Sequence, residues 1–132
     1  MYTIQQEPFG FSLVFKGVVN AAEMKEWRRE SERYLNSQKA GFNVFVNMQD
    51  LEPLTAEAQA VMEEGQRAYR NHGMVRSVVI LNNTLITLQF KRIAKESGIY
   101  QWERYIDASV TADWERRGIN WLVEGIDPDL IA

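Results

Sequence analysis

FNVFVNMQDLEPLTAE, residues 42–57, joins an apolar strand to a short polar turn and then to the start of a helix. Phe42–Val46 is almost continuously apolar, a pattern typical of a strand that is covered on both faces and lies centrally in its sheet. Thr55 can cap the helix that follows, and Glu57 in the first turn suits the positive end of the helix dipole. Because ligands and partners of sheet-and-helix domains meet the ends of the strands, function is expected in the turn from Asn47 to Thr55.

Upstream of this stretch, aromatic residues alternate with smaller or more polar ones from Phe9 to Phe15, after a shorter alternation at Tyr2 and Ile4. This pattern predicts an N-terminal hairpin that turns near Gly10. Asn20 and Glu23 then form a capping-box pattern, which predicts that a first helix begins at Ala21 and runs to about Gln38.

Downstream, strand and helix patterns continue to alternate. The sequence predicts a helix from the Thr55 cap to Asn71, a buried strand at Val75–Leu81, a helix between residues 82–84 and Gly98, an edge strand at Tyr100–Ile106, and a last helix from Ser109 or Thr111 to Gly125. In this last helix Val110, Trp114, Trp121 and Leu122 would share a face. The pattern indicates an α/β fold: one domain over residues 1–132, with a mixed sheet of about five strands, an N-terminal hairpin, right-handed βα crossovers and about four helices.

Composition excludes several classes of function. A chain of 132 residues that is 45% hydrophobic can build one core. With 15 Lys and Arg against 18 Asp and Glu, the chain has no positive field to attract nucleic acid. We expect a cytoplasmic protein without membrane insertion, since cysteine is absent and neither a secretory signal nor a membrane-length apolar run is visible.

The strand-to-helix turn FNVFVNMQDLEPLT, the N-terminal hairpin and the closing NWLVEG around Asn120-Trp121-Leu122 resemble the STAS-like domains related to bacterial anti-sigma-factor antagonists. The likeness is one of pattern over nearly the whole chain, and the nearest branch is that of uncharacterised bacterial STAS-like proteins. The resemblance implies a non-enzymatic regulatory domain. Signalling members present a phosphorylatable Ser or Thr after an Asp, where this chain has Thr55, Ala56 and Glu57. The usual phosphoacceptor is therefore missing, and the interpretation of Thr55 as a helix cap is preferred to that of a phosphorylation site.

Our leading hypothesis is that the loop of residues 47–57 binds a protein partner or a second copy of the chain. The candidate contact residues are Asn47, Gln49, Asp50, Glu52 and Thr55, with Leu51 and Leu54 as apolar anchors if they are exposed.

An alternative hypothesis is a carrier or sensor of a small, lipid-like apolar ligand. The aromatic content exceeds what a short core needs, and ligand pockets are largely apolar. The residues concerned are Trp27, Trp102, Trp114 and Trp121, with Phe9, Phe11 and Phe15. The candidate pocket residues are Phe11, Trp27, Trp114 and Trp121.

No catalytic, metal or cofactor site is predicted. His72, the one histidine, has no partner that the sequence places beside it. The polar residues Asn47, Asp50 and Glu52 lack the spacing of a calcium loop, and the glycine-rich phosphate motifs are absent.

Overall fold

The computed structural model describes residues 1–130 of the chain. The strands are β1 (Tyr2–Glu7), β2 (Gly10–Phe15), β3 (Phe42–Asn47), β4 (Met74–Leu81) and β5 (Glu103–Asp107). The α-helices are α1 (Ala21–Ser37), α2 (Ala56–Asn71), α3 (Thr84–Ser97) and α4 (Trp114–Glu124), and short 3-10 turns cover Tyr100–Trp102 and Pro128–Leu130.

The five strands form one mixed sheet whose spatial order, β1-β2-β3-β4-β5, is also their order along the chain. β1 and β2 form an antiparallel hairpin in which Tyr2 lies opposite Phe15, and the later neighbours are all parallel. The structure confirms four predictions from the sequence: the α/β class, the N-terminal hairpin, the central place of Phe42–Val46 in the sheet and the edge position of β5.

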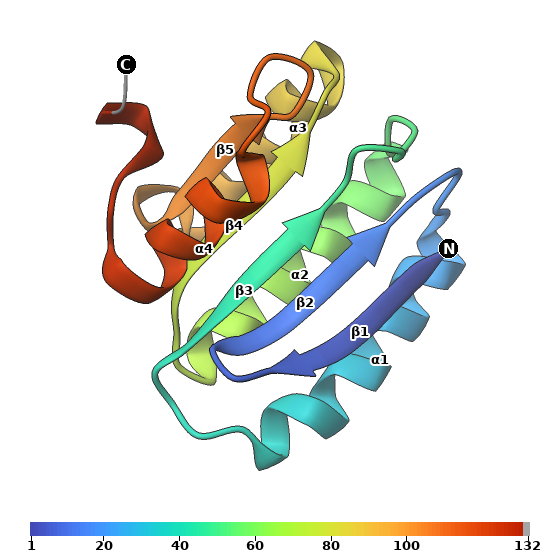
Figure 1. Ribbon diagram of the computed structural model, residues 1–132. Helices are drawn as coiled ribbons and strands as arrows, with labels where there is room; N and C mark the ends of the chain where they lie inside the picture. The colour runs from blue at the N-terminus through green and yellow to red at the C-terminus, as the bar shows by residue number, and fades with distance from the viewer. Residues whose placement is uncertain (131–132) are drawn as a thin grey trace.

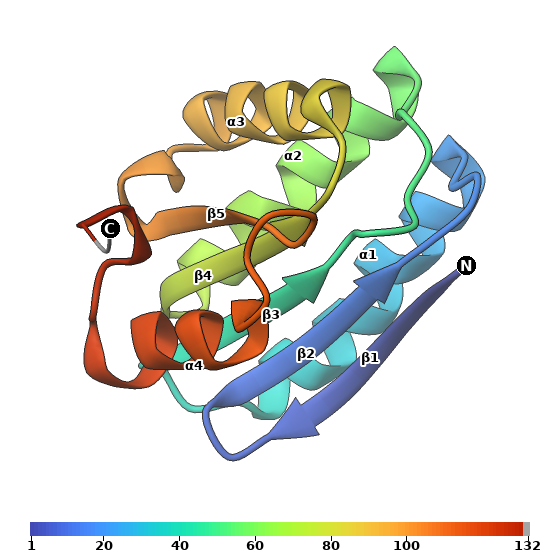
Figure 2. The same cartoon turned by 45° about the horizontal axis from the view of Figure 1, so that its top comes forward.

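The helices lie in two unequal layers (Figures 1 and 2). α1, α2 and α3 cover one face of the sheet, and α4 lies alone on the other face, against β3, β4 and β5. This follows from the strand order, because crossovers of one hand that add each new parallel strand on the same side place all their helices on one face. The face of β1 and β2 on the α4 side is left without a covering helix.

Each face has its own apolar core. The larger core lies beneath α1, α2 and α3, and the smaller one joins α4 to the sheet through Phe45, Val78 and Trp121. Gly65 of α2 lets the helix approach α1, since a Cβ added there would lie 2.1 Å from Cζ3 of Trp27. The side of α2 that carries Ala58, Val61, Met62 and Gly65 is buried.

Two boundary predictions were wrong. β5 starts at Glu103 rather than Tyr100, because residues 100–102 first make a 3-10 turn. α4 starts at Trp114, later than predicted, and Val110 lies in the preceding turn with 81% of its surface exposed. The carboxylate of Asp113 stabilises this later start by pairing with Arg116 and Arg117 in the first turn of the helix.

Candidate functional site

The loop after β3 is anchored to the loop after β2 by backbone hydrogen bonds. The amide of Gly17 donates to the carbonyl of Asp50 at 2.8 Å, and the amide of Glu52 donates to the carbonyl of Gly17 at 3.0 Å. These paired bonds form an isolated parallel bridge between Gly17 and Leu51. The middle of the predicted binding loop is therefore held in one conformation by its neighbour.

The second half of this loop is anchored to α3. The side-chain amide of Gln89 accepts from the amide of Leu54 at 2.9 Å and donates to the carbonyl of Leu54 at 3.2 Å. The side chains of Leu51 and Leu54 are buried in the larger core. Because both leucines are buried, they are not available as anchors for a partner. They pack into the core and hold the loop against it instead.

The polar candidates in the loop divide into two groups. Oδ1 of Asn47 accepts from the backbone amide of Gln49 at 3.1 Å, and Oγ1 of Thr55 accepts from the amide of Ala58 at 3.2 Å, so both shape the backbone. The capping role predicted for Thr55 is confirmed. Asp50 and Glu52 are exposed, and neither carboxylate makes an ion pair or hydrogen bond within residues 1–130. The loop thus presents two acidic side chains on a fixed backbone.

The four aromatic residues predicted to line one pocket lie on opposite sides of the sheet. Phe11 and Trp27 belong to the core beneath α1 and α2, whereas Trp121 and Trp114 belong to the core around α4. The nitrogen of Trp121 donates to the carbonyl of Ser77 at 2.9 Å, and Arg104 lies over its ring at 4.3 Å. Because the sheet separates the two pairs, the prediction of a shared pocket was wrong. Of the four residues, Trp27 is the one that lines the internal cavity described next.

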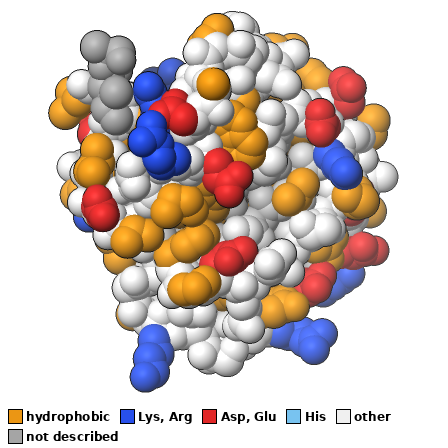
Figure 3. Space-filling view, in the orientation of Figure 1, with side chains coloured by type: hydrophobic (Ala, Val, Ile, Leu, Met, Phe, Trp, Pro, Cys, Tyr) orange, Lys and Arg blue, Asp and Glu red, His pale blue; other side chains and the backbone are white. Residues whose placement is uncertain are grey.

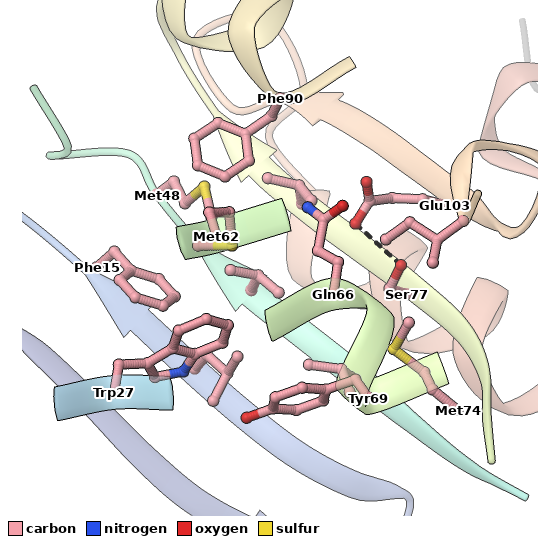
Figure 4. Close-up of a pocket in the computed structure, with 15 residues that line it drawn as sticks. Phe15, Trp27, Met48, Met62, Gln66, Tyr69, Met74, Ser77, Phe90 and Glu103 are labelled. Carbon is pink, nitrogen blue, oxygen red and sulfur yellow. Dashed lines mark hydrogen bonds between the residues drawn. The ribbon is translucent and has the colours of Figure 1, made fainter. Parts of the chain in front are cut away.

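A small cavity lies between the sheet and the layer of α1, α2 and α3 (Figure 4). Aromatic and methionine side chains surround most of it, and the polar residues Gln66, Ser77 and Glu103 line one part. It leaves about 30 Å³ for the centre of a water-sized sphere. A cavity needs roughly 10–15 Å³ on this measure to hold one water molecule, so there is space for about two waters and none for a lipid chain.

Glu103 is the unusual group at this cavity. Oγ of Ser77 donates to its carboxyl group at 3.0 Å and the hydroxyl of Tyr105 donates to it at 2.6 Å. Neither partner carries a positive charge, and 4% of the residue's surface is exposed. Burial raises the pKa of the Glu103 carboxyl from 4.5 to about 7, although the two hydrogen bonds act in the opposite direction. Burial and the neighbouring Glu103 also raise the pKa of Tyr105. The site can therefore hold or release a proton near neutral pH.

The sequence analysis assigned no role to Glu103, because charged side chains are common on edge strands. Glu103 and Tyr105 alternate with Arg104 and Ile106, so the strand period could have placed Glu103 on an inner face. The sequence does not give the strand register, which puts Glu103 opposite Ser77.

His72 caps the C-terminus of α2, where Nδ1 lies 2.8 Å from the carbonyl oxygen of Ala68 and Nε2 lies 3.3 Å from Oδ1 of Asn36. Its ring therefore lies between the last turn of its own helix and the side chain of Asn36 on α1. Within residues 1–130 no three side chains of the metal-binding types gather closely enough to hold an ion.

No protein-family model and no curated protein sequence matches this chain. In the part of the chain that the structure describes, no helix has the length and apolar character needed to span a membrane.

Proposed function

We propose that this protein is a bacterial STAS-like interaction domain, without enzymatic activity, that binds a protein partner or a second copy of itself through the loop of residues 47–57. The contact would be made by the exposed carboxylates of Asp50 and Glu52, with Gln49 beside them. A cytoplasmic location belongs to the same proposal. The proposal as a whole rests on the resemblance of sequence pattern and on the geometry of the loop.

The observation that carries the proposal is the contrast between the loop's fixed backbone and its exposed charges. Hydrogen bonds from Gly17 and Gln89 and the buried leucines hold the backbone, so little conformational entropy would be lost when a partner docks. Asp50 and Glu52 form no ion pair within residues 1–130, so a basic surface on the partner would complement them. This is the arrangement expected of a preformed recognition loop.

The internal cavity does not favour the carrier hypothesis. With space for about two waters, it could admit a lipid-like molecule only if α2 or α3 moved away from the sheet. The leading hypothesis needs no such movement, because the residues it uses are already on the surface.

A site-specific photocrosslinking experiment tests the proposal. A photoreactive amino acid is placed at Gln49 in the source cells, so that the carboxylates of Asp50 and Glu52 stay in place. A control places it at Glu64, which is exposed on α2 about eight residues beyond the helix start, or roughly 12 Å along its axis. We expect a discrete crosslinked band, of a second protein or of a dimer, from position 49 and not from position 64. Equal labelling at the two positions, or no crosslink at position 49, would contradict binding through this loop.

A further inference from the structure

The uncovered part of the sheet forms one wall of a groove. α4 packs on β3, β4 and β5, so the α4-side face of β1 and β2 stays open beside it (Figure 1). Between α4 and these strands, the volume that the centre of a water-sized sphere can occupy is about 270 Å³. This is roughly nine times the volume of the internal cavity on the same measure. It is large enough for side chains of a partner, which the internal cavity is not.

The walls of this groove are aromatic and aliphatic. Phe9 and Val14 contribute from the hairpin, Phe45 from β3, and Trp114 and Ile119 from α4. The rings of Trp114 and Phe45 pack with their centroids 6.2 Å apart, which fixes the indole beside the groove. None of these five side chains is fully exposed, so they form a lined recess rather than a protruding patch.

Within residues 1–130, the charged side chains that line the groove are acidic. Glu7 reaches it from β1 and Glu115 from α4, and the hydroxyl of Ser12 donates to the Glu7 carboxylate at 3.1 Å and positions it. The nearest arginines of α4, Arg116 and Arg117, pair with Asp113 instead. Figure 3, which views this face, shows acidic side chains among apolar ones in its middle, a group of basic side chains to their upper left, and further basic side chains near the edges.

We propose that this groove binds a short peptide segment of a partner protein that carries arginine or lysine next to apolar side chains. The two carboxylates favour a cation, and the face of Trp114 can add a cation–π contact. The apolar walls would bury the neighbouring side chains of the peptide. Asn47 lines the groove at the start of the recognition loop, so this inference rests on the proposed function and adds the chemistry of the partner.

The test uses a five-residue peptide of alternating arginine and leucine, blocked at both ends, titrated into ¹⁵N-labelled protein. We expect a saturable shift of the Trp114 indole NH resonance, assigned with Trp114→Phe. The double variant Glu7→Gln, Glu115→Gln should bind about three- to tenfold more weakly, in line with two partly exposed charge contacts. Glu124→Gln, which removes an exposed carboxylate at the far end of α4, should leave the affinity unchanged.

Several results would overturn the inference: no saturable shift at millimolar peptide, equal binding of a peptide with glutamate in place of arginine, or unchanged affinity in the double variant. A concentration-dependent dimer that Glu7→Gln, Glu115→Gln abolishes, with no peptide binding, would assign the groove to a second copy and also overturn it. Asp50→Ala, Glu52→Ala separates the two proposals, because that variant should keep peptide binding while losing the loop crosslink partner.

Discussion

Glu103 shows how one carboxyl group can determine the pH dependence of a protein. Its neighbours Ser77 and Tyr105 donate hydrogen bonds but bring no positive charge, and the cavity beside it is lined mainly by apolar side chains. Transferring a carboxylate from water to such a place is costly, so the group retains its proton to a higher pH than an exposed glutamate would.

We predict that Glu103→Gln flattens the pH dependence of stability between about pH 5 and 8. The folded-state pKa of about 7 lies above the ordinary 4.5, so the folded protein keeps a proton that the unfolded chain releases. Stability of the wild type therefore falls as pH rises through this interval, by about 2–3 kcal/mol from the pKa difference. Glutamine cannot ionise and removes this dependence. Urea unfolding at several pH values measures it, with the exposed Glu64→Gln as control. An unchanged slope in Glu103→Gln would show that the carboxyl does not titrate in this range.

For single residues, the sequence predicted local structural roles such as helix capping better than it predicted which side chains are exposed to solvent. The caps at Asn20 and Thr55 could be identified because capping depends on neighbours three residues away. The burial of Leu51 and Leu54 could not, because it depends on the packing of this loop into the core beneath α1, α2 and α3, which lie elsewhere in the sequence. Glu103 was missed for the same reason, since its partner Ser77 is 26 residues away.

At the scale of elements, the close packing of α1 on α2 depends on a glycine. Gly65 faces the indole of Trp27, and the same indole stacks on Tyr69 with ring centroids 5.6 Å apart. No side chain larger than hydrogen fits at position 65 unless Trp27 moves.

We predict that Gly65→Ala lowers the free energy of unfolding by about 1–3 kcal/mol, the usual cost of overpacking a core. The loss would occur although alanine favours helix over glycine by about 1 kcal/mol. Combining the change with Trp27→Phe should cost less than the sum of the two single changes, because the smaller ring vacates part of the space. Denaturant unfolding measures all three variants, with Glu64→Ala as the control on the exposed side of the helix. A Gly65→Ala protein as stable as the wild type would refute the close contact.

Helix and strand assignments held best where the periodic pattern was long and capped, as in α1 and α2. They failed at the start of α4, where Val110 fits the apolar period of the helix but Asp113, through its pairs with Arg116 and Arg117, marks the first turn. The start of β5 was displaced because the aromatic residues Tyr100 and Trp102 favour strand in isolation yet lie in a 3-10 turn. In both cases a local preference was outweighed by the connection between elements.

At the scale of the whole molecule, the strand order produces the asymmetry on which the proposed groove depends. Adding β3, β4 and β5 successively on one side of the hairpin places α1, α2 and α3 on one face, and α4 only partly covers the other. The alternation of elements predicted the α/β class, but the strand order and the resulting groove depend on pairings between distant segments, which one sequence does not give. The recognition loop was predicted from its place after a buried strand, whereas the groove beside α4 was not.

Native mass spectrometry of the protein isolated gently from its source cells can show whether association requires the loop of residues 47–57. We expect a complex with a second protein, or a dimer, for the wild type and for Glu64→Ala, and a bare monomer for Asp50→Ala, Glu52→Ala. Retention of the complex in the double variant would contradict recognition through the loop of residues 47–57. A monomer that carries only a small molecule of a few hundred daltons would contradict it as well, and would favour the carrier hypothesis instead.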